Sequence, residues 1–317
     1  LHGAVIDHVG TNQTRVYREV QALGAELEKI GQETLGAVTE AKVALYFDWD
    51  NWWAAECSAG PSCELKYKEE VLNYYEAFHS LNIPVDIVGP EDDLGSYKVL
   101  AAPLLYMTKT GYDEKIRKFT QNGGIFITTF FSGIVDEHDL VILGGYPGRL
   151  RDILGIWVEE EDALPSGTEN SFVYRGTRYP ARLICDLLHS EGAEVLSTYE
   201  SDFYAGMPAV TVNHFGKGRG YYVAARSGKA FYRKFLGDIC EEAGIQPVIL
   251  PQEGLEAAER KNENGRFLFL LNHGNRELEV KVREGGKDLI SGEAYSPGGR
   301  IFLEAKGVRI LKIEEKI

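Results

Sequence analysis

Apolar and polar positions change their spacing along this chain, and each change marks a different element. In residues 14–33, Val16, Val20, Leu23, Leu27 and Ile30 recur at helical spacing, with charged residues between them. This pattern predicts an amphipathic helix that begins after an N-cap at Thr14 and stops near Gly31. Because one helix cannot bury a core by itself, we expect it to pack against another part of the protein.

Short apolar runs and helical stripes then alternate over residues 40–250. The predicted strands are 43–47, 85–88, 99–102, 125–129, 195–199, 209–213 and 220–224, and the predicted helices are 64–81, 113–122, 181–188 and 230–243. This order is typical of a doubly wound α/β fold with a mostly parallel sheet. Residues 144–176 are richer in glycine, proline and acidic residues, and we interpret the run Glu159–Asp162 as a solvated loop. The glycines at 216 and 218 predict a hairpin turn.

From Gly254 onward the pattern changes again. Short strand candidates at 267–272, 277–282, 301–303 and 308–313 are separated by glycine-rich turns. A small antiparallel β domain is therefore expected, docked on its neighbour because so short a segment buries little apolar surface.

The aromatic segment from Trp49 to Trp53 is the most unusual stretch. It holds three of the four tryptophans of the chain, together with Asp50 and Asn51, directly after the first predicted strand. The carboxyl ends of parallel strands open into a crevice where α/β proteins bind ligands and partners. This polar-aromatic loop is therefore either a contact surface or the packed top of the domain.

Composition excludes several classes of function. The chain has 317 residues and a formal net charge of −14, which disfavours a nucleic-acid partner. No stretch is long and apolar enough to predict a membrane span, and the start has no signal-peptide pattern, so a cytoplasmic location is expected. The first residue is Leu1 and not methionine, which suggests a piece of a longer protein. Cys57 and Cys63 could pair locally but are expected to be reduced.

Candidate catalytic chemistry is sparse. The turn after the strand at 125–129 is where a hydrolase or amidotransferase of this fold carries its nucleophile, but Phe130 and Phe131 stand there in place of small residues. Ser132 with His138 and Asp136 or Asp139 forms a triad by residue type only. The remaining histidines lack ligand spacing, so no metal site is expected, and no motif predicts a cofactor.

At both ends of its first 53 residues the chain resembles a known family. The segment His2-Gly3-Ala4-Val5-Ile6-Asp7-His8-Val9-Gly10, the segment Thr14–Val20 (TRVYREV) and the segment Val43–Trp53 resemble family 42 β-galactosidases. The resemblance implies an amidotransferase-like, flavodoxin-like trimerisation domain that lacks the amidotransferase cysteine. It divides the chain into the last loop and helix of a truncated (β/α)8 barrel at 1–39, the trimerisation domain at 40–251 and a C-terminal β-sandwich-like domain at 252–317.

The resemblance also implies function. Family members hydrolyse terminal β-galactosides by a retaining mechanism that uses two carboxylates about 5 Å apart. Both lie in the barrel upstream of Leu1, so no catalytic residue is expected in this chain. His2 aligns with a histidine that hydrogen-bonds galactose. A homotrimer is implied, in which Trp49, Asp50, Trp52 and Trp53 lie at a subunit interface and wall the pocket, because tryptophan rings stack on sugars.

Two alternatives stay open at this stage. One is a free-standing amidotransferase-like protein that binds a carbohydrate or metabolite. The other is a hydrolase that uses Ser132.

Overall fold

The computed structural model describes residues 5–314, except 7, 9 and 59. The chain divides into two compact units, and each is described by itself. One unit is residues 41–246; the other joins residues 1–40 to residues 247–317.

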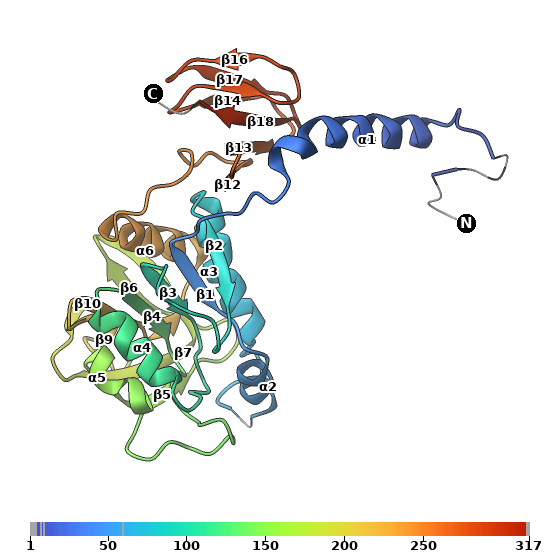
Figure 1. The fold of residues 1–317 in the computed structure, drawn as a ribbon. Helices are drawn as coiled ribbons and strands as arrows, with labels where there is room; N and C mark the ends of the chain where they lie inside the picture. Colours follow the sequence, from blue (N-terminus) through green and yellow to red (C-terminus); the bar gives the residue numbers. More distant parts are fainter. Residues whose placement is uncertain (1–4, 7, 9, 59, 315–317) are drawn as a thin grey trace. The chain divides into compact units, whose positions relative to one another are not determined.

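The unit formed by residues 41–246 is an α/β domain (Figure 1). Its elements in chain order are β1 (Val43–Tyr46), α2 (Trp49–Cys57), α3 (Tyr67–Ser80), β2 (Val85–Val88), β3 (Val99–Ala102), α4 (Tyr112–Gln121), β4 (Ile125–Thr129), η1 (Gly148–Leu150), α5 (Arg151–Leu154), β5 (Ile156–Ala163), β6 (Asn170–Tyr174), β7 (Thr177–Ser190), β8 (Glu194–Thr198), β9 (Pro208–Phe215), β10 (Gly218–Val223), β11 (Ala225–Arg226) and α6 (Lys229–Glu242).

The main sheet of this unit mixes parallel and antiparallel strands. Among the described residues it has seven strands in the order β2-β1-β3-β4-β10-β9-β8. The first five are parallel, whereas β9 and β8 pair in antiparallel fashion. Every residue of β1, β3 and β4 is buried, as expected of strands that are covered on both faces. The mixed sheet and its first, parallel half agree with the sequence-based expectation.

Two predictions for the second half of this unit were wrong. Residues 181–188, expected to be a helix, lie in β7, and the acidic run Glu159–Asp162 lies in β5 and not in a solvated loop. The two strands pair with each other in a second, antiparallel sheet, β11-β7-β5, with β6 also paired to β7. Because β7 is buried on both faces over most of its length, its apolar residues are contiguous and lose the alternation that identifies a strand.

The other unit contains α1 (Arg15–Thr34) and a small β domain. The strands of this domain are β12 (Leu255–Asn262), β13 (Gly265–Asn272), β14 (Leu278–Lys281), β15 (Gly286–Asp288), β16 (Ala294–Tyr295), β17 (Arg300–Leu303) and β18 (Val308–Ile313). Within the described part of the chain they form a five-stranded sheet and the two-stranded β14-β17 sheet, with all pairings antiparallel. The small antiparallel domain is as predicted.

The C-terminal end of α1 is held by the turn between β12 and β13. The amide Nδ2 of Asn262 donates to the carbonyl oxygens of Glu33 at 2.8 Å and Leu35 at 3.1 Å, and Asn264 donates to the carbonyl of Gln32 at 3.2 Å. The last carbonyls of a helix have no partner within it, so these side chains satisfy groups that α1 leaves open. The end of the helix is therefore held, but none of its residues is buried, so the expected packing along its apolar stripe is not formed by the described residues.

Candidate interaction surface at the carboxyl edge of the sheet

The aromatic segment after β1 is helical and is not the loop that the sequence suggested. Asp48 is the N-cap of α2, and its carboxylate accepts a hydrogen bond from the Asp50 N–H at 3.3 Å. Aspartate is favoured at this position because it satisfies an N–H that has no partner in the first helical turn. As a result the tryptophans project from one short helix.

The polar side chains of this segment form ion pairs and hydrogen bonds with other parts of the chain. Lys109 forms ion pairs with Asp48 at 2.9 Å and with Asp50 at 2.7 Å. Burial lowers the pKa of Lys109, but the hydrogen bonds and charges of the two aspartates outweigh it and raise that pKa. The buried amide of Asn51 donates to the Leu104 carbonyl at 3.1 Å and accepts from the Met107 N–H at 2.8 Å. These contacts fix α2 against the loop that follows β3.

The tryptophan rings form an exposed cluster. Trp49 and Trp53 are 56% and 58% exposed, whereas Trp52 is partly buried against the core. Trp49 stacks on Trp52 with ring centroids 5.2 Å apart, and the indole N–H of Trp52 donates to Glu56 at 2.6 Å. Large exposed aromatic surface is typical of contact sites. The segment therefore has features of both interpretations, because the Trp52 ring packs on the domain and the Trp49 and Trp53 rings are exposed for contact.

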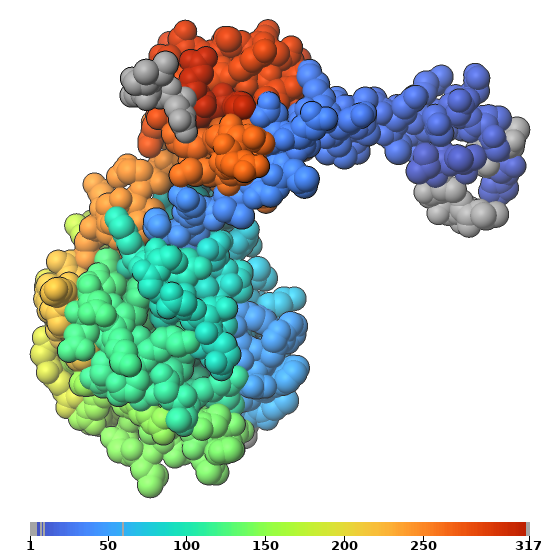
Figure 2. Space-filling view, viewed as in Figure 1, coloured from blue at the N-terminus to red at the C-terminus, as the bar shows by residue number. Residues whose placement is uncertain are grey.

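A second exposed apolar segment follows β4 at the same edge of the sheet. We call residues 136–145 the β4 finger. Leu140, Val141 and Leu143 are 63%, 56% and 91% exposed. Figure 1 shows this loop and α2 at the lower end of the unit, and Figure 2 shows the surface of that end. Sequence reasoning missed the finger, although the run Leu140–Leu143 between Asp139 and two glycines was a visible signal.

The finger and α2 are connected through one segment. Lys109 pairs with the start of α2, and the next N–H, that of Thr110, donates to the carboxylate of Glu137 in the finger at 3.1 Å. The pKa of Glu137 is lowered, first by hydrogen bonding to the Thr110 side chain and to a lesser degree by backbone N–H groups, including that of Thr110. Residues 109 and 110 therefore link the helix that carries the tryptophan cluster to the finger at the carboxyl edge of the sheet.

The turn after β4 contains a strained residue, and its serine is engaged in the core. Phe131 has φ of 57°, a left-handed conformation that costs a bulky residue energy, and it is almost fully buried. The hydroxyl of Ser132 is buried, accepts from the Leu105 N–H at 3.0 Å and lies 2.9 Å from the Thr128 hydroxyl. Among the described residues no hydrogen bond joins Ser132 to His138, so the geometry does not form the triad.

The close carboxylates in the second sheet are also unsuited to catalysis. Glu161 and Asp186 are directly opposite on β5 and β7. Burial raises the pKa of Glu161 to about 7, and burial together with the charge of Glu161 raises the pKa of Asp186 well above its usual range. Asp186 is buried and accepts from the Tyr222 hydroxyl at 2.6 Å, which leaves it out of reach of a sugar.

The cysteines and histidines form no recognisable centre within the described residues. Cys57 and Cys63 are exposed and unpaired, while burial raises the pKa of Cys185 and Cys240 to about 12, which disfavours the reactive thiolate. In the described part of the chain no group of three or more His, Cys, Asp or Glu residues is placed to hold a metal ion. His2 lies outside the described residues. None of the described helices is both long and apolar enough to cross a membrane.

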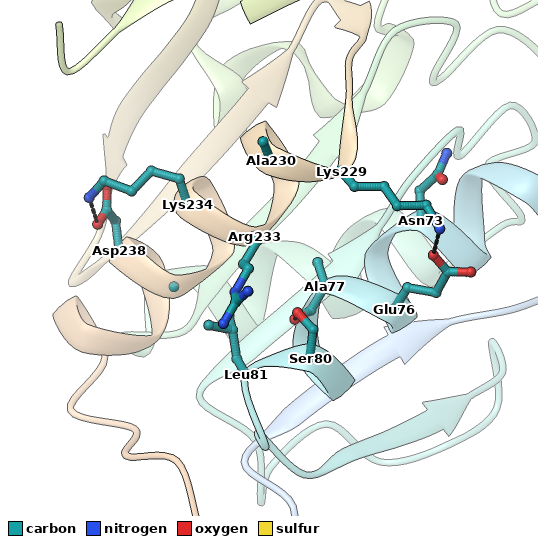
Figure 3. Close-up of a pocket in the computed structure, with 11 residues that line it drawn as sticks. Asn73, Glu76, Ala77, Ser80, Leu81, Lys229, Ala230, Arg233, Lys234 and Asp238 are labelled. Atoms are coloured by element: carbon teal, nitrogen blue, oxygen red, sulfur yellow. Dashed lines mark hydrogen bonds and ion pairs between the residues drawn. The ribbon is translucent and has the colours of Figure 1, made fainter. Parts of the chain in front are cut away.

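A groove of about 760 Å³ lies between α3 and α6 (Figure 3). Its floor is made of small and apolar residues, which are Ala77, Leu81, Ala230 and Gly237. Its rim is polar, with Lys229 bonded to Glu76 and Lys234 bonded to Asp238. Because the rim holds charged pairs without a nucleophile or an elbow, the groove suits contact better than chemistry.

Comparison with known proteins gives the same assignment for both parts of the chain. Residues 41–246 match the family described as "Beta-galactosidase trimerisation domain", and residues 254–312 match "Beta-galactosidase C-terminal domain". The β-galactosidase BgaP of Planococcus sp. (strain L4) is 49% identical over 98% of this chain, which covers 47% of BgaP.

Solved structures agree with these matches. The β-galactosidase of Bacillus circulans sp. alkalophilus has a TM-score of 0.95 and 44% identity, over 98% of this chain and 47% of that one. The enzyme of Rahnella sp. R3 has a TM-score of 0.90 and 40% identity, over 98% of this chain and 46% of that one. The chain thus spans about half the length of the relatives it matches.

Proposed function

Because this chain belongs to glycoside hydrolase family 42, the β-galactosidases, we propose that it is the non-catalytic, C-terminal portion of a retaining β-galactosidase. The whole enzyme hydrolyses terminal β-D-galactosides, and this portion assembles it as a homotrimer and completes the surroundings of its active site. The observation that carries the proposal is that the two family domains account for residues 41–246 and 254–312.

The chemistry of the chain supports a non-catalytic role. A retaining glycosidase needs two accessible carboxylates about 5 Å apart, one as acid and base and one as nucleophile. Of the opposed pair, Asp186 is buried and Glu161 is partly buried, and Asp48 and Asp50 are held by Lys109. The catalytic carboxylates therefore belong to a separate catalytic domain, where His2 hydrogen-bonds the galactose.

Helix α1 is the expected contact to that domain. Its apolar stripe is open along the helix, and Val16, Val20, Leu23 and Leu27 are each at least 40% exposed to solvent within the described chain. A helix with such a stripe is stabilised in water when the stripe is covered. We assign α1 as the last helix of a (β/α)8 barrel that covers it.

The finer fold assignment is amidotransferase-like. Its support is the strand order β2-β1-β3-β4-β10 in parallel and the left-handed Phe131 at the turn after β4. In this assignment Phe131 takes the place of the amidotransferase nucleophile, and its ring stacks on Tyr106 with centroids 5.1 Å apart. Aromatic packing of Phe131 on Tyr106 thus occupies the position of the amidotransferase nucleophile.

The tryptophan cluster is assigned to the subunit interface near the mouth of the active site. Trp49 and Trp53 offer exposed rings for a protein surface or a sugar. Trp49 stacks on Trp52, and the rings of Trp49 and Trp53 are in contact at a centroid distance of 6.1 Å. Asp50 stays about half exposed in its ion pair with Lys109 and has an oxygen edge available for hydroxyl groups.

The test is the solution mass of this chain, by light scattering during gel filtration, with a galactosidase assay on the same fractions. We expect a trimer without activity. A monomer without activity shows that the catalytic domain is needed for assembly and weakens the interface assigned to the tryptophans. Activity in the peak of the chain itself overturns the proposal.

A further inference from the structure

The β4 finger is built to present an apolar tip. Leu143 is 91% exposed and is followed by Gly144 and Gly145, both in conformations with positive φ. Three of the four residues 140–143 are exposed and apolar. An exposed apolar cluster of this kind is typical of a contact site. The base of the finger carries three carboxylates, those of Asp136, Glu137 and Asp139.

The finger is held in one shape by hydrogen bonds. The Asp136 carboxylate accepts from the N–H groups of His138 at 2.9 Å and Leu140 at 3.1 Å, and the Asp136 N–H donates to the Leu140 carbonyl at 2.9 Å. On the far side the Ile142 N–H donates to the Ile134 carbonyl at 2.9 Å. A loop fixed in this way loses little conformational entropy when it binds.

The α3–α6 groove is a hollow, whereas the finger projects. Gly237 lines the groove without a side chain, and a Cβ placed on it makes ordinary contact with Leu81 at 3.6 Å, so a larger side chain there takes up space in the groove. Lys229 and Lys234 on the rim are each paired, but the structure records no ion pair for Arg233 among the described residues. Figure 3 shows the Arg233 side chain extended toward Leu81.

The two surfaces match in shape and charge. An apolar tip with carboxylates at its base fits a hollow with an apolar floor. Two of the cations on the rim are paired with carboxylates, so Arg233 is the rim cation that can meet the carboxylates of the finger. A contact between two fingers is disfavoured, because it brings together carboxylates of like charge. A contact between two different surfaces of identical subunits is heterologous, and such contacts form a ring when the rotation between neighbouring subunits closes.

We propose that the β4 finger of one copy docks in the α3–α6 groove of the next copy and closes the trimer ring. This inference rests on the proposed self-assembly and adds the two surfaces that carry it. Leu143 lies over Gly237, and Arg233 meets the carboxylates at the base of the finger.

The test is the solution mass of the whole protein, catalytic domain included, measured for three variants. Leu143→Asp changes a side chain exposed to solvent in this fold, and Gly237→Leu places a good helix former in α6. Both variants are therefore expected to fold, which circular dichroism checks. Both are expected to lower the measured mass about threefold, from trimer to monomer. Phe203→Asp, a change at a side chain 71% exposed elsewhere in the same unit, is the control and leaves the trimer intact.

A charge reversal separates this contact from general loss of folding. Arg233→Glu alone is expected to shift the protein toward monomer, and Arg233→Glu combined with Glu137→Lys is expected to restore the trimer. If the unchanged protein is a trimer but Leu143→Asp or Gly237→Leu is still a trimer, the docking is wrong and the proposed function stands. If the unchanged protein is not a trimer, the proposed assembly itself falls.

Discussion

Replacing Glu161 by glutamine should stabilise the protein at alkaline pH. Glu161 is directly opposite Asp186 on paired strands, so two acids share one partly buried site. Burial raises the pKa of Glu161 from 4.5 to about 7. The folded state thus favours the protonated form, and this contribution to stability is complete below pH 4.5 and is lost as the pH rises through about 7.

The size of the effect follows from the shift. At about 1.4 kcal/mol per pKa unit, ionisation of Glu161 costs about 3 kcal/mol at pH 8. The variant Glu161→Gln has no charge to bury, so its free energy of unfolding should exceed that of the unchanged protein by about 3 kcal/mol at pH 8. At pH 4.5 the same difference should fall below about 0.5 kcal/mol.

The assay is urea denaturation at both pH values, followed by tryptophan fluorescence. All four tryptophans lie in the unit of residues 41–246, which contains the acid pair. Glu160→Gln is the matched control, because Glu160 is the neighbouring residue on the same strand and is exposed. An equal gain at both pH values, or no gain at pH 8, refutes the reasoning.

Four further changes test other parts of the structure. Asn51→Ala should lower the free energy of unfolding by about 2 kcal/mol, measured by urea denaturation, because it leaves the buried Met107 N–H unpaired and removes one of the two donors to the Leu104 carbonyl. Gly218→Ala should lower it by more than about 3 kcal/mol in the same assay, because a Cβ there lies 2.1 Å from the Gly124 carbonyl oxygen. Asn262→Ala should cost about 1 kcal/mol and increase hydrogen exchange in the last turn of α1, since the Leu35 carbonyl loses its donor and the Glu33 carbonyl keeps only that of Asn264. Trp53→Ala should leave the stability of the whole protein within about 0.5 kcal/mol but reduce trimer formation or activity, because the ring is largely exposed.

Each of these expectations has a contradicting result. Unchanged urea midpoints for Asn51→Ala or Gly218→Ala show that the surrounding backbone adapts. Unchanged exchange at the end of α1 shows that water replaces Asn262 at no cost. A Trp53→Ala protein with the original mass and kinetics removes the case for the tryptophan cluster as an interface.

Local patterns identified most of the regular elements. The amphipathic helix α1, the strands β1, β3 and β4 and the C-terminal strands β13, β17 and β18 were all predicted close to their observed bounds, because each has a clear period or a short apolar run between turn residues. The sequence also predicted that the turn after β4 carries no nucleophile, since phenylalanines occupy positions 130 and 131.

The candidate site was only partly readable. The sequence singled out Trp49 and Trp53, but it could not say that Lys109 binds the nearby aspartates and leaves the rings as the available groups. That pairing joins residues far apart in the chain, so no local pattern reports it. The β4 finger was missed for the opposite reason, because an apolar run suggests burial unless the fold shows that it projects.

The sequence by itself determined the family, the helical and strand periods and the overall acidic charge, because these depend on residue type and local order. The tertiary structure decided which apolar runs are covered on both faces. Residues 181–188 form a strand because β5, β6 and β11 pair along β7. The same pairing places Glu161 opposite Asp186 in a partly buried position, where its pKa is raised. Pairing between distant strands and burial on both faces are non-local, so they follow from the packed chain and not from its local pattern.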